Sequence, residues 1–153
     1  MDSNTLSLSY THQPLGIYLL KANFYCFLII ISFTWLTLTL FPMLDKPSVE
    51  LSLSHLLERL VLAPLLYTCC LVIVFVALSY FVKQIYYLAL ITALFGAVSH
   101  IAIIPGYVGA IFALCFLLSL VYQYWDEHSR AHAVFVILML NIFIHFVTFL
   151  LAI

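Results

Sequence analysis

The sequence predicts an all-α fold: a polytopic membrane helical bundle of about five transmembrane helices plus a short interfacial amphipathic helix. Apolar residues make up 67% of the 153 positions and charged residues only 7%, whereas a soluble domain carries roughly 25% charged residues. The apolar residues also form long unbroken runs, and a helix needs roughly 20 of them to cross the hydrocarbon core. These runs lack the alternation typical of a membrane β-barrel, so helices are the structure that satisfies the backbone in lipid.

The charge content excludes several classes of protein. Five Lys and Arg against six Asp and Glu are too few to cover a water-facing surface, and they form no basic patch for a nucleic acid. All four cysteines fall inside apolar runs, where a thiol behaves as a small unreactive residue. We therefore exclude a soluble enzyme, a nucleic-acid binder and a disulfide-stapled secreted module.

Five apolar runs define a single transmembrane domain over residues 1–153. Breaking or polar residues close the first four runs, at Pro42, Lys83, Pro105 and Asp126. The expected spans are 22–41, 60–82, 85–104, 107–125 and 131–153. A count of four is left open, in case the first run is interfacial rather than transmembrane.

The amphipathic helix is expected just before the second span. Leu56, Leu57 and Leu60 fall on one helical face, whereas the neighbouring Ser, His, Glu and Arg side chains fall elsewhere. Such a stripe predicts a helix in the plane of the interface, after which the chain turns into the membrane near Pro64. The alternative is an aqueous extension of the second span.

The third and fourth spans are expected to form an antiparallel hairpin. Pro105 and Gly106 leave room only for a tight reversal. Small residues recur at four-residue spacing on both sides of it, and such stripes let helix backbones approach closely. The expected packing residues are Ala89, Ala93, Ala97, Gly106, Gly109, Ala110 and Ala113.

Orientation follows from the distribution of the basic residues. With five spans, Lys21, Lys83 and Arg130 share one side, and Lys46 and Arg59 share the other. The positive-inside rule then places the N-terminus in the cytoplasm and the C-terminus on the far side. We expect a multi-pass protein of a bacterial inner membrane, with no cleaved signal peptide because the N-terminus lacks a basic segment.

Two histidines are the most informative polar residues inside the spans. His100 lies about one turn before the Pro105–Gly106 reversal, and His145 lies deep in the last span, so both are expected at similar depth in the same leaflet. They could ligate a haem iron or relay a proton. The alternative is a pair of ordinary buried histidines that hydrogen-bond to Ser99 and Asn141.

A second pair, His128 and His132, is a candidate metal site in the loop after the fourth span. Residues four apart on a helix face the same way, and acidic residues stand nearby. Two histidines are fewer ligands than zinc requires, so a helix start with Ser129 as its N-cap is the simpler interpretation.

No catalytic residue is predicted. Spans two to five contain no Asp, Glu, Lys or Arg, which argues against an ion-coupled transporter. Nucleophile elbows, phosphate-binding loops and paired-histidine zinc motifs are absent. The hydroxyl residues of the spans are too scattered to line a pore and are expected to bond to backbone carbonyls instead.

The C-terminal half resembles a known family. The run Ile104-Pro105-Gly106-Tyr107-Val108-Gly109, the apolar span that follows, and Ala131-His132-Ala133-Val134 after a short polar loop are similar to the bacterial branch of the Ypt/Rab-interacting membrane proteins. The resemblance covers roughly residues 85–153 and implies a five-span bundle with a cytosolic N-terminus and a scaffold or trafficking role. It supplies no functional residues, and the short acidic loop after Tyr124 departs from the family pattern.

We expect a non-catalytic integral membrane protein that acts by helix packing, as an accessory subunit, scaffold or oligomer. Its expected partners are the lipid bilayer and other integral membrane proteins or itself, and no nucleic acid. No cofactor is expected. Two alternatives stay open: a membrane enzyme, either lipid-facing or built on haem b or another redox centre at His100 and His145 or at the loop residues Asp126–His132, and a small passive pore or permease.

Overall fold

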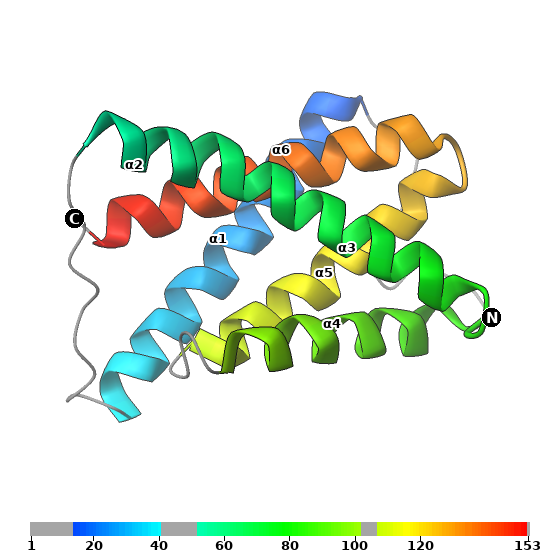
Figure 1. The fold of residues 1–153 in the computed structure, drawn as a ribbon, viewed down its shortest axis with the longest axis horizontal. Coiled ribbons are helices and arrows are strands. Elements are labelled where there is room, and N and C mark those ends of the chain that lie inside the picture. Colours follow the sequence, from blue (N-terminus) through cyan, green and yellow to red (C-terminus); the bar gives the residue numbers. More distant parts are fainter. Residues whose placement is uncertain (1–13, 41–51, 102–106, 153) are drawn as a thin grey trace.

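The structure, a computed structural model, describes residues 14–40, 52–101 and 107–152, and helices make up almost all of these ranges (Figure 1). No strand occurs within them, which confirms the all-α prediction. The elements are α1 (Leu15–Leu40), α2 (Leu53–Leu57), the π-helical turn η1 (Glu58–Leu62), α3 (Ala63–Ser79), α4 (Ile85–Ile101), α5 (Val108–Asp126) and α6 (Arg130–Ala152).

Helix α1 begins seven residues before the expected start of the first span, at Leu15 rather than at residue 22. The carbonyl of Pro14 accepts hydrogen bonds from the backbone N–H groups of Ile17 and Tyr18, so the first turn forms directly after the proline. Lys21 had marked the expected boundary, but a single lysine does not end a helix, since its long side chain can carry the charge toward the interface.

The segment before the second span is not separated from it by a turn. Backbone dihedrals stay helical through Leu57, Glu58, Leu62 and Ala63, and residues 53–79 form one continuous apolar helix. The segment therefore extends the second span, as the alternative expectation had it. The expected turn of the chain near Pro64 is wrong. Pro64 has no N–H to donate one turn back, and the wider π turn just before it accommodates the proline within the helix.

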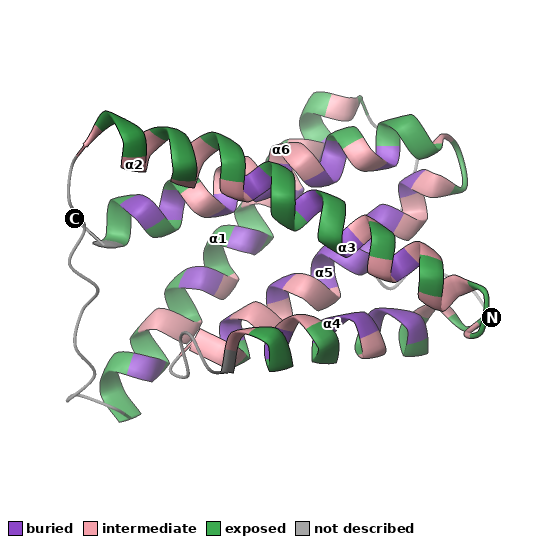
Figure 2. Ribbon diagram, viewed as in Figure 1, coloured by how far each residue is buried: buried purple, intermediate pink, exposed green. Residues whose placement is uncertain are grey.

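Helices α5 and α6 form the centre of the bundle. They pack against each other, and α1 contacts both of them. Helix α3 packs on α6 and α4, and α4 lies mainly on α5. Figure 2 shows the consequence, with buried residues concentrated on α5 and α6 while α1, α3 and α4 each turn one broad face outward.

Helices α4 and α5 form the expected antiparallel pair. Gly96 meets Cys115 near the connected ends of the two helices, and Leu88 shares a cavity with Gln123 at the opposite ends. Small residues make this approach close. Ala89, Ala93, Ala97 and Ala110 are all buried, and Ala113 is half-buried. Gly109, expected to pack in the same way, is exposed and lies beside Phe33 of α1. Gly106 and the predicted Pro–Gly turn lie outside the described residues.

The bundle has two distinct ends. At one end Leu15 of α1 lies beside His132 of α6, and Tyr18 packs on Trp125 at the end of α5. Lys83 and Arg130 lie at the same end, around one cavity. We call this end the charged end. Helix α6 runs away from it, so the first and last described helical residues lie at opposite ends of the bundle (Figure 1).

Four helices of the described chain are long and apolar enough to cross a membrane, which identifies the chain as a membrane protein: Leu15–Leu40, Leu53–Ser79, Val108–Asp126 and Arg130–Leu151. The apolar helix α4 is shorter, with 17 residues. The first helix is thus long enough to span, and α4 is the one whose crossing decides between four spans and five.

Two aromatic residues near the end of α5 lie inside the bundle, although interfacial aromatic side chains are common at the ends of spans. Tyr122 and Trp125 are buried, with ring centroids 4.9 Å from Phe75 and 5.2 Å from Tyr18, respectively. They face inward because α5 is surrounded by other helices, so a position near a span end does not by itself direct a side chain toward the lipid headgroups.

Candidate functional site: a polar cluster between three helices

His100 is held near the end of α4 by its own helix. Its Nδ1 lies 2.8 Å from the carbonyl oxygen of Gly96 and 3.1 Å from the hydroxyl of Ser99. A carbonyl oxygen only accepts hydrogen bonds, so Nδ1 carries the proton and, in the neutral imidazole, Nε2 is left as an acceptor. The expected Ser99 contact is therefore present.

Tyr67 of α3 is the hydrogen-bond partner of Nε2 of His100. Its hydroxyl donates to Nε2 of His100 over 2.7 Å, and the two rings are stacked with centroids 5.3 Å apart. The other histidine, His145 of α6, lies on the same tyrosine at a centroid distance of 5.2 Å. Tyr67 thus brings together the two histidines that sequence reasoning paired, and we call these three residues the Tyr67 cluster.

Asn141 does not serve His145 as expected. Its side-chain nitrogen donates to the hydroxyl of Thr68 over 2.8 Å, in the buried contact between α6 and α3. The imidazole of His145 makes no hydrogen bond to any residue that the structure describes. The adjacent residues Tyr67 and Thr68 therefore present a polar strip of α3 to two other helices, and the imidazole of His145 keeps its hydrogen-bonding capacity free within the described part of the chain.

The geometry does not suit a haem held between the two histidines. An axial imidazole needs one nitrogen free for iron, whereas both nitrogens of His100 are engaged, by Gly96 and by Tyr67. Tyr67 also lies against both imidazole rings, where a macrocycle would have to pass. We therefore derive no chemistry from haem at this position.

The second histidine pair lies across a helix start. His128 stands in the turn, where its Nδ1 is 3.3 Å from the carbonyl oxygen of Tyr124, whereas His132 belongs to α6 and lies beside Trp125. The N–H of His132 points to the hydroxyl of Ser129, which is the predicted N-cap. Residues 14–40, 52–101 and 107–152 hold no group of three or more His, Cys, Asp or Glu side chains suited to a metal.

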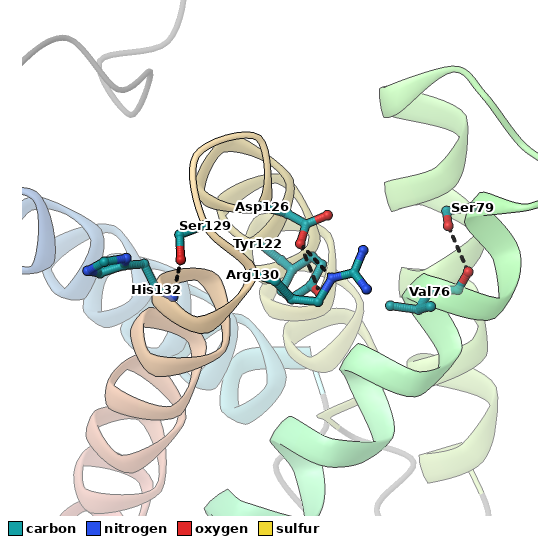
Figure 3. A network of polar contacts seen from close by, with 7 residues as sticks. All are labelled: Val76, Ser79, Tyr122, Asp126, Ser129, Arg130 and His132. Atoms are coloured by element: carbon teal, nitrogen blue, oxygen red, sulfur yellow. Dashed lines mark hydrogen bonds and ion pairs between the residues drawn. The ribbon is translucent and has the colours of Figure 1, made fainter.

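A second polar network occupies the charged end (Figure 3). Asp126 accepts from Nε of Arg130 at 3.2 Å and from the hydroxyl of Tyr122 at 3.4 Å. Figure 3 shows the Arg130 side chain extending from the start of α6 toward α3, on the side where Val76 and Ser79 lie. These groups border a half-open cavity of about 220 Å³.

Hydroxyl side chains of the spans serve their own helices. Thr39, Ser79, Thr92, Ser99 and Ser119 each donate to a carbonyl three or four residues earlier. This confirms the expected role for these five residues, whereas Thr68 accepts a hydrogen bond from another helix.

The four cysteines differ in how far they are buried. Cys26 is buried and Cys115 half-buried, but Cys69 and Cys70 are exposed on α3. The expectation that all four are core residues is therefore wrong for these two. Their part of α3 faces away from α4 and α6, and an apolar run of sequence does not reveal which of its faces is covered.

Tyr67 is the central residue that sequence reasoning missed. A tyrosine in the middle of an apolar span, next to a threonine, was the available signal, because a phenol inside hydrocarbon needs a partner. Pairing it with His100 and His145 required the packing of three helices, which the spacing along one chain does not give.

No protein-family model, curated protein sequence or solved structure matches this chain. The resemblance of its second half to the Ypt/Rab-interacting membrane proteins therefore stays a prediction.

Proposed function

We propose that this chain is a non-catalytic subunit or scaffold of a membrane-protein assembly, which packs its helices against another integral membrane protein or a second copy of itself. The carrying observation is the Tyr67 cluster, because it reaches the outer surface of the bundle. Tyr67 is 41% exposed, and His100 and His145 are half-buried. The hydroxyl oxygen of Tyr67 and the imidazole of His145 can each make a further hydrogen bond, which lipid tails cannot supply.

The position of the cluster along the helices supports a protein partner. Tyr67 lies about 12 Å along the helix beyond the charged Arg59, and its partner His100 stands one residue before the end of α4. If these helices span the membrane, the cluster lies in the outer part of the hydrocarbon region, on one side of the bilayer. Polar side chains of neighbouring helices are the usual partners there, with Ser, Thr, Asn, Gln and His the most frequent.

The outer surface offers further contact area. Helix α4 exposes Tyr87, Leu94, Phe95 and Val98, whereas its small residues are used inside the chain against α5. A partner would therefore meet large apolar side chains together with one polar cluster. Such a surface discriminates partners by the hydrogen bonds that they can complete.

The proposal includes a topology and a location. With α4 as a fifth span, the N-terminus lies in the cytoplasm and the C-terminus on the far side of a bacterial inner membrane. The placement of Leu15 and the end of α6 at opposite ends of the bundle supports an odd number of crossings. Lys83 and Arg130 at one end support the same orientation by the positive-inside rule.

Site-specific photocrosslinking tests the proposal. A photoreactive phenylalanine analogue replaces Leu66, which is exposed next to Tyr67 on α3, and the matched control replaces Phe24, which is similarly exposed on α1. Illumination of intact membranes should give a discrete protein adduct from position 66. Position 24 should give mainly lipid adducts, because no described polar cluster lies beside it.

Tyr67→Phe and His145→Leu variants of the Leu66 probe provide the necessary control. Both should weaken the protein adduct while leaving the amount of inserted protein unchanged. If position 66 gives only lipid adducts and the purified chain is a stable monomer, the proposed role is wrong.

A further inference from the structure

The cavity at the charged end has a mixed wall. Its apolar side comes from α3 and α4, including Phe75 and Leu88. Its polar side holds Lys83, Gln123, Glu127 and the Asp126–Arg130 pair. They include four of the eleven charged residues of the chain, which come from the turn between α3 and α4 and from the junction of α5 with α6. A cavity with one polar and one apolar wall suits an amphipathic ligand, which has a polar part and an apolar part.

The charges of the cavity are not all neutralised. Asp126 and Arg130 pair with each other over 3.2 Å. The ammonium of Lys83 donates to the carbonyl oxygen of Ser79 at 3.2 Å, and the carboxylate of Glu127 has no ion pair within the described part of the chain. One spare cation and one spare anion therefore border the same cavity. A zwitterion complements that arrangement better than an anion or a cation alone.

The anion of the cavity narrows the chemistry of the ligand. Glu127 is exposed at the cavity, and its carboxylate accepts hydrogen bonds but cannot donate them. A primary ammonium can donate to this carboxylate, whereas a trimethylammonium has no N–H to donate.

We propose that this cavity binds the phosphoethanolamine headgroup of a phospholipid, with its phosphate at Lys83 and its ammonium at Glu127. The charged end is where the helices leave the apolar core, so a headgroup at that level can leave its acyl chains along the apolar wall. The inference rests on the cavity and not on the Tyr67 cluster, so a test of one proposal does not decide the other.

Native mass spectrometry of the full chain tests the site, after reconstitution with phosphatidylethanolamine, phosphatidylcholine or phosphatidylglycerol of identical acyl chains. We expect retention of phosphatidylethanolamine above the other two. Lys83→Gln and Glu127→Gln should each lower that retention by about tenfold, the usual effect of losing one charge-assisted hydrogen bond. Lys21→Gln is the matched control, because it removes a cation near the charged end outside the cavity.

Two further measurements test whether the cation at position 83 matters and whether the bound ligand is a lipid or a free phosphate. Lys83→Arg keeps the cation and should keep most of the retention. Inorganic phosphate and soluble glycerophosphoethanolamine, added in excess, should not displace the lipid, because neither carries acyl chains. Equal retention of all three lipids, unchanged retention in the Lys83 and Glu127 variants of normal helicity, or displacement by inorganic phosphate would each overturn the assignment.

Discussion

At the residue scale, the polar side chains of this bundle form specific contacts between helices. Asn141 and Thr68 join α6 to α3, and Tyr67 joins α3 to His100 of α4. Each side chain stands in an apolar run, where an unpaired polar group is costly. The hydrogen bonds therefore fix which faces of the three helices meet.

Tyr67→Phe should lower the stability of the bundle modestly. The change keeps the ring contacts and removes only the donor to His100, so we expect a loss of about 1 kcal/mol in the free energy of unfolding. Thermal unfolding in detergent, followed by circular dichroism, measures it. Tyr87→Phe is the control, because this exposed tyrosine has no hydrogen bond to a described residue, and an equal loss in both variants would contradict the assigned role.

A double-mutant cycle should detect the Asn141–Thr68 contact. Asn141→Leu and Thr68→Val each remove one partner of a buried hydrogen bond. The coupling energy is expected to be about 0.6 kcal/mol, the average of such pairs in a membrane bundle, and at most about 1.7 kcal/mol. A coupling near zero in denaturant titrations of the four proteins would mean that the bond contributes nothing to helix association.

At the element scale, the α4–α5 hairpin depends on a close approach at Gly96. A Cβ atom added there would lie 2.6 Å from Sγ and 3.3 Å from Cβ of Cys115. The sulfur, rather than any glycine requirement of the backbone, is what excludes a side chain at this position.

Gly96→Ala should therefore destabilise the protein by about 1–2 kcal/mol, because the steric conflict outweighs the gain in helix propensity. The loss should become smaller in the background of Cys115→Ala, where the sulfur is gone and only the 3.3 Å contact with the Cβ atom remains. Gly16→Ala is the control, since nothing lies within 4 Å of its added Cβ. Unfolding curves of the five proteins, wild type included, measure these differences, and a loss of the same size without the sulfur would contradict the explanation.

At the scale of the whole molecule, the arrangement depends on which helices cross the bilayer. Four are long enough by themselves, and α4 lies antiparallel to α5 although it is only 17 residues long. A bilayer can thin locally around a short helix, and a neighbouring span can hold it in place. We therefore expect α4 to cross.

Cysteine labelling in a cysteine-free background tests the crossings. Gln84→Cys and His128→Cys should react from one side of the membrane, and Ser54→Cys and Tyr107→Cys from the other. All four positions lie at or near helix ends. Labelling of positions 84 and 107 from the same side would show that α4 does not cross and would leave four spans.

Much of the architecture follows from the sequence. Long apolar runs and scarce charge determine that the chain is helical and resides in a membrane, because lipid leaves the backbone no other partners than its own. Ser129 and the polar breaks fix most of the other helix ends to within a few residues. The sequence did not predict the early start of α1 or the continuous helix through Pro64. An α-helix can contain a single lysine, and it can contain a proline that follows a π turn.

The tertiary structure alone decided which faces are buried and which polar groups meet. The amphipathic signal is weak in a chain that is apolar on every side, so sequence could not tell that Tyr122 faces inward and Cys69 outward. Nor could it place Tyr67 against two histidines, or gather Lys83, Glu127 and Gln123 around one cavity. Such contacts arise when helices that are distant along the chain pack side by side, and the packing depends on the shapes of all their side chains together.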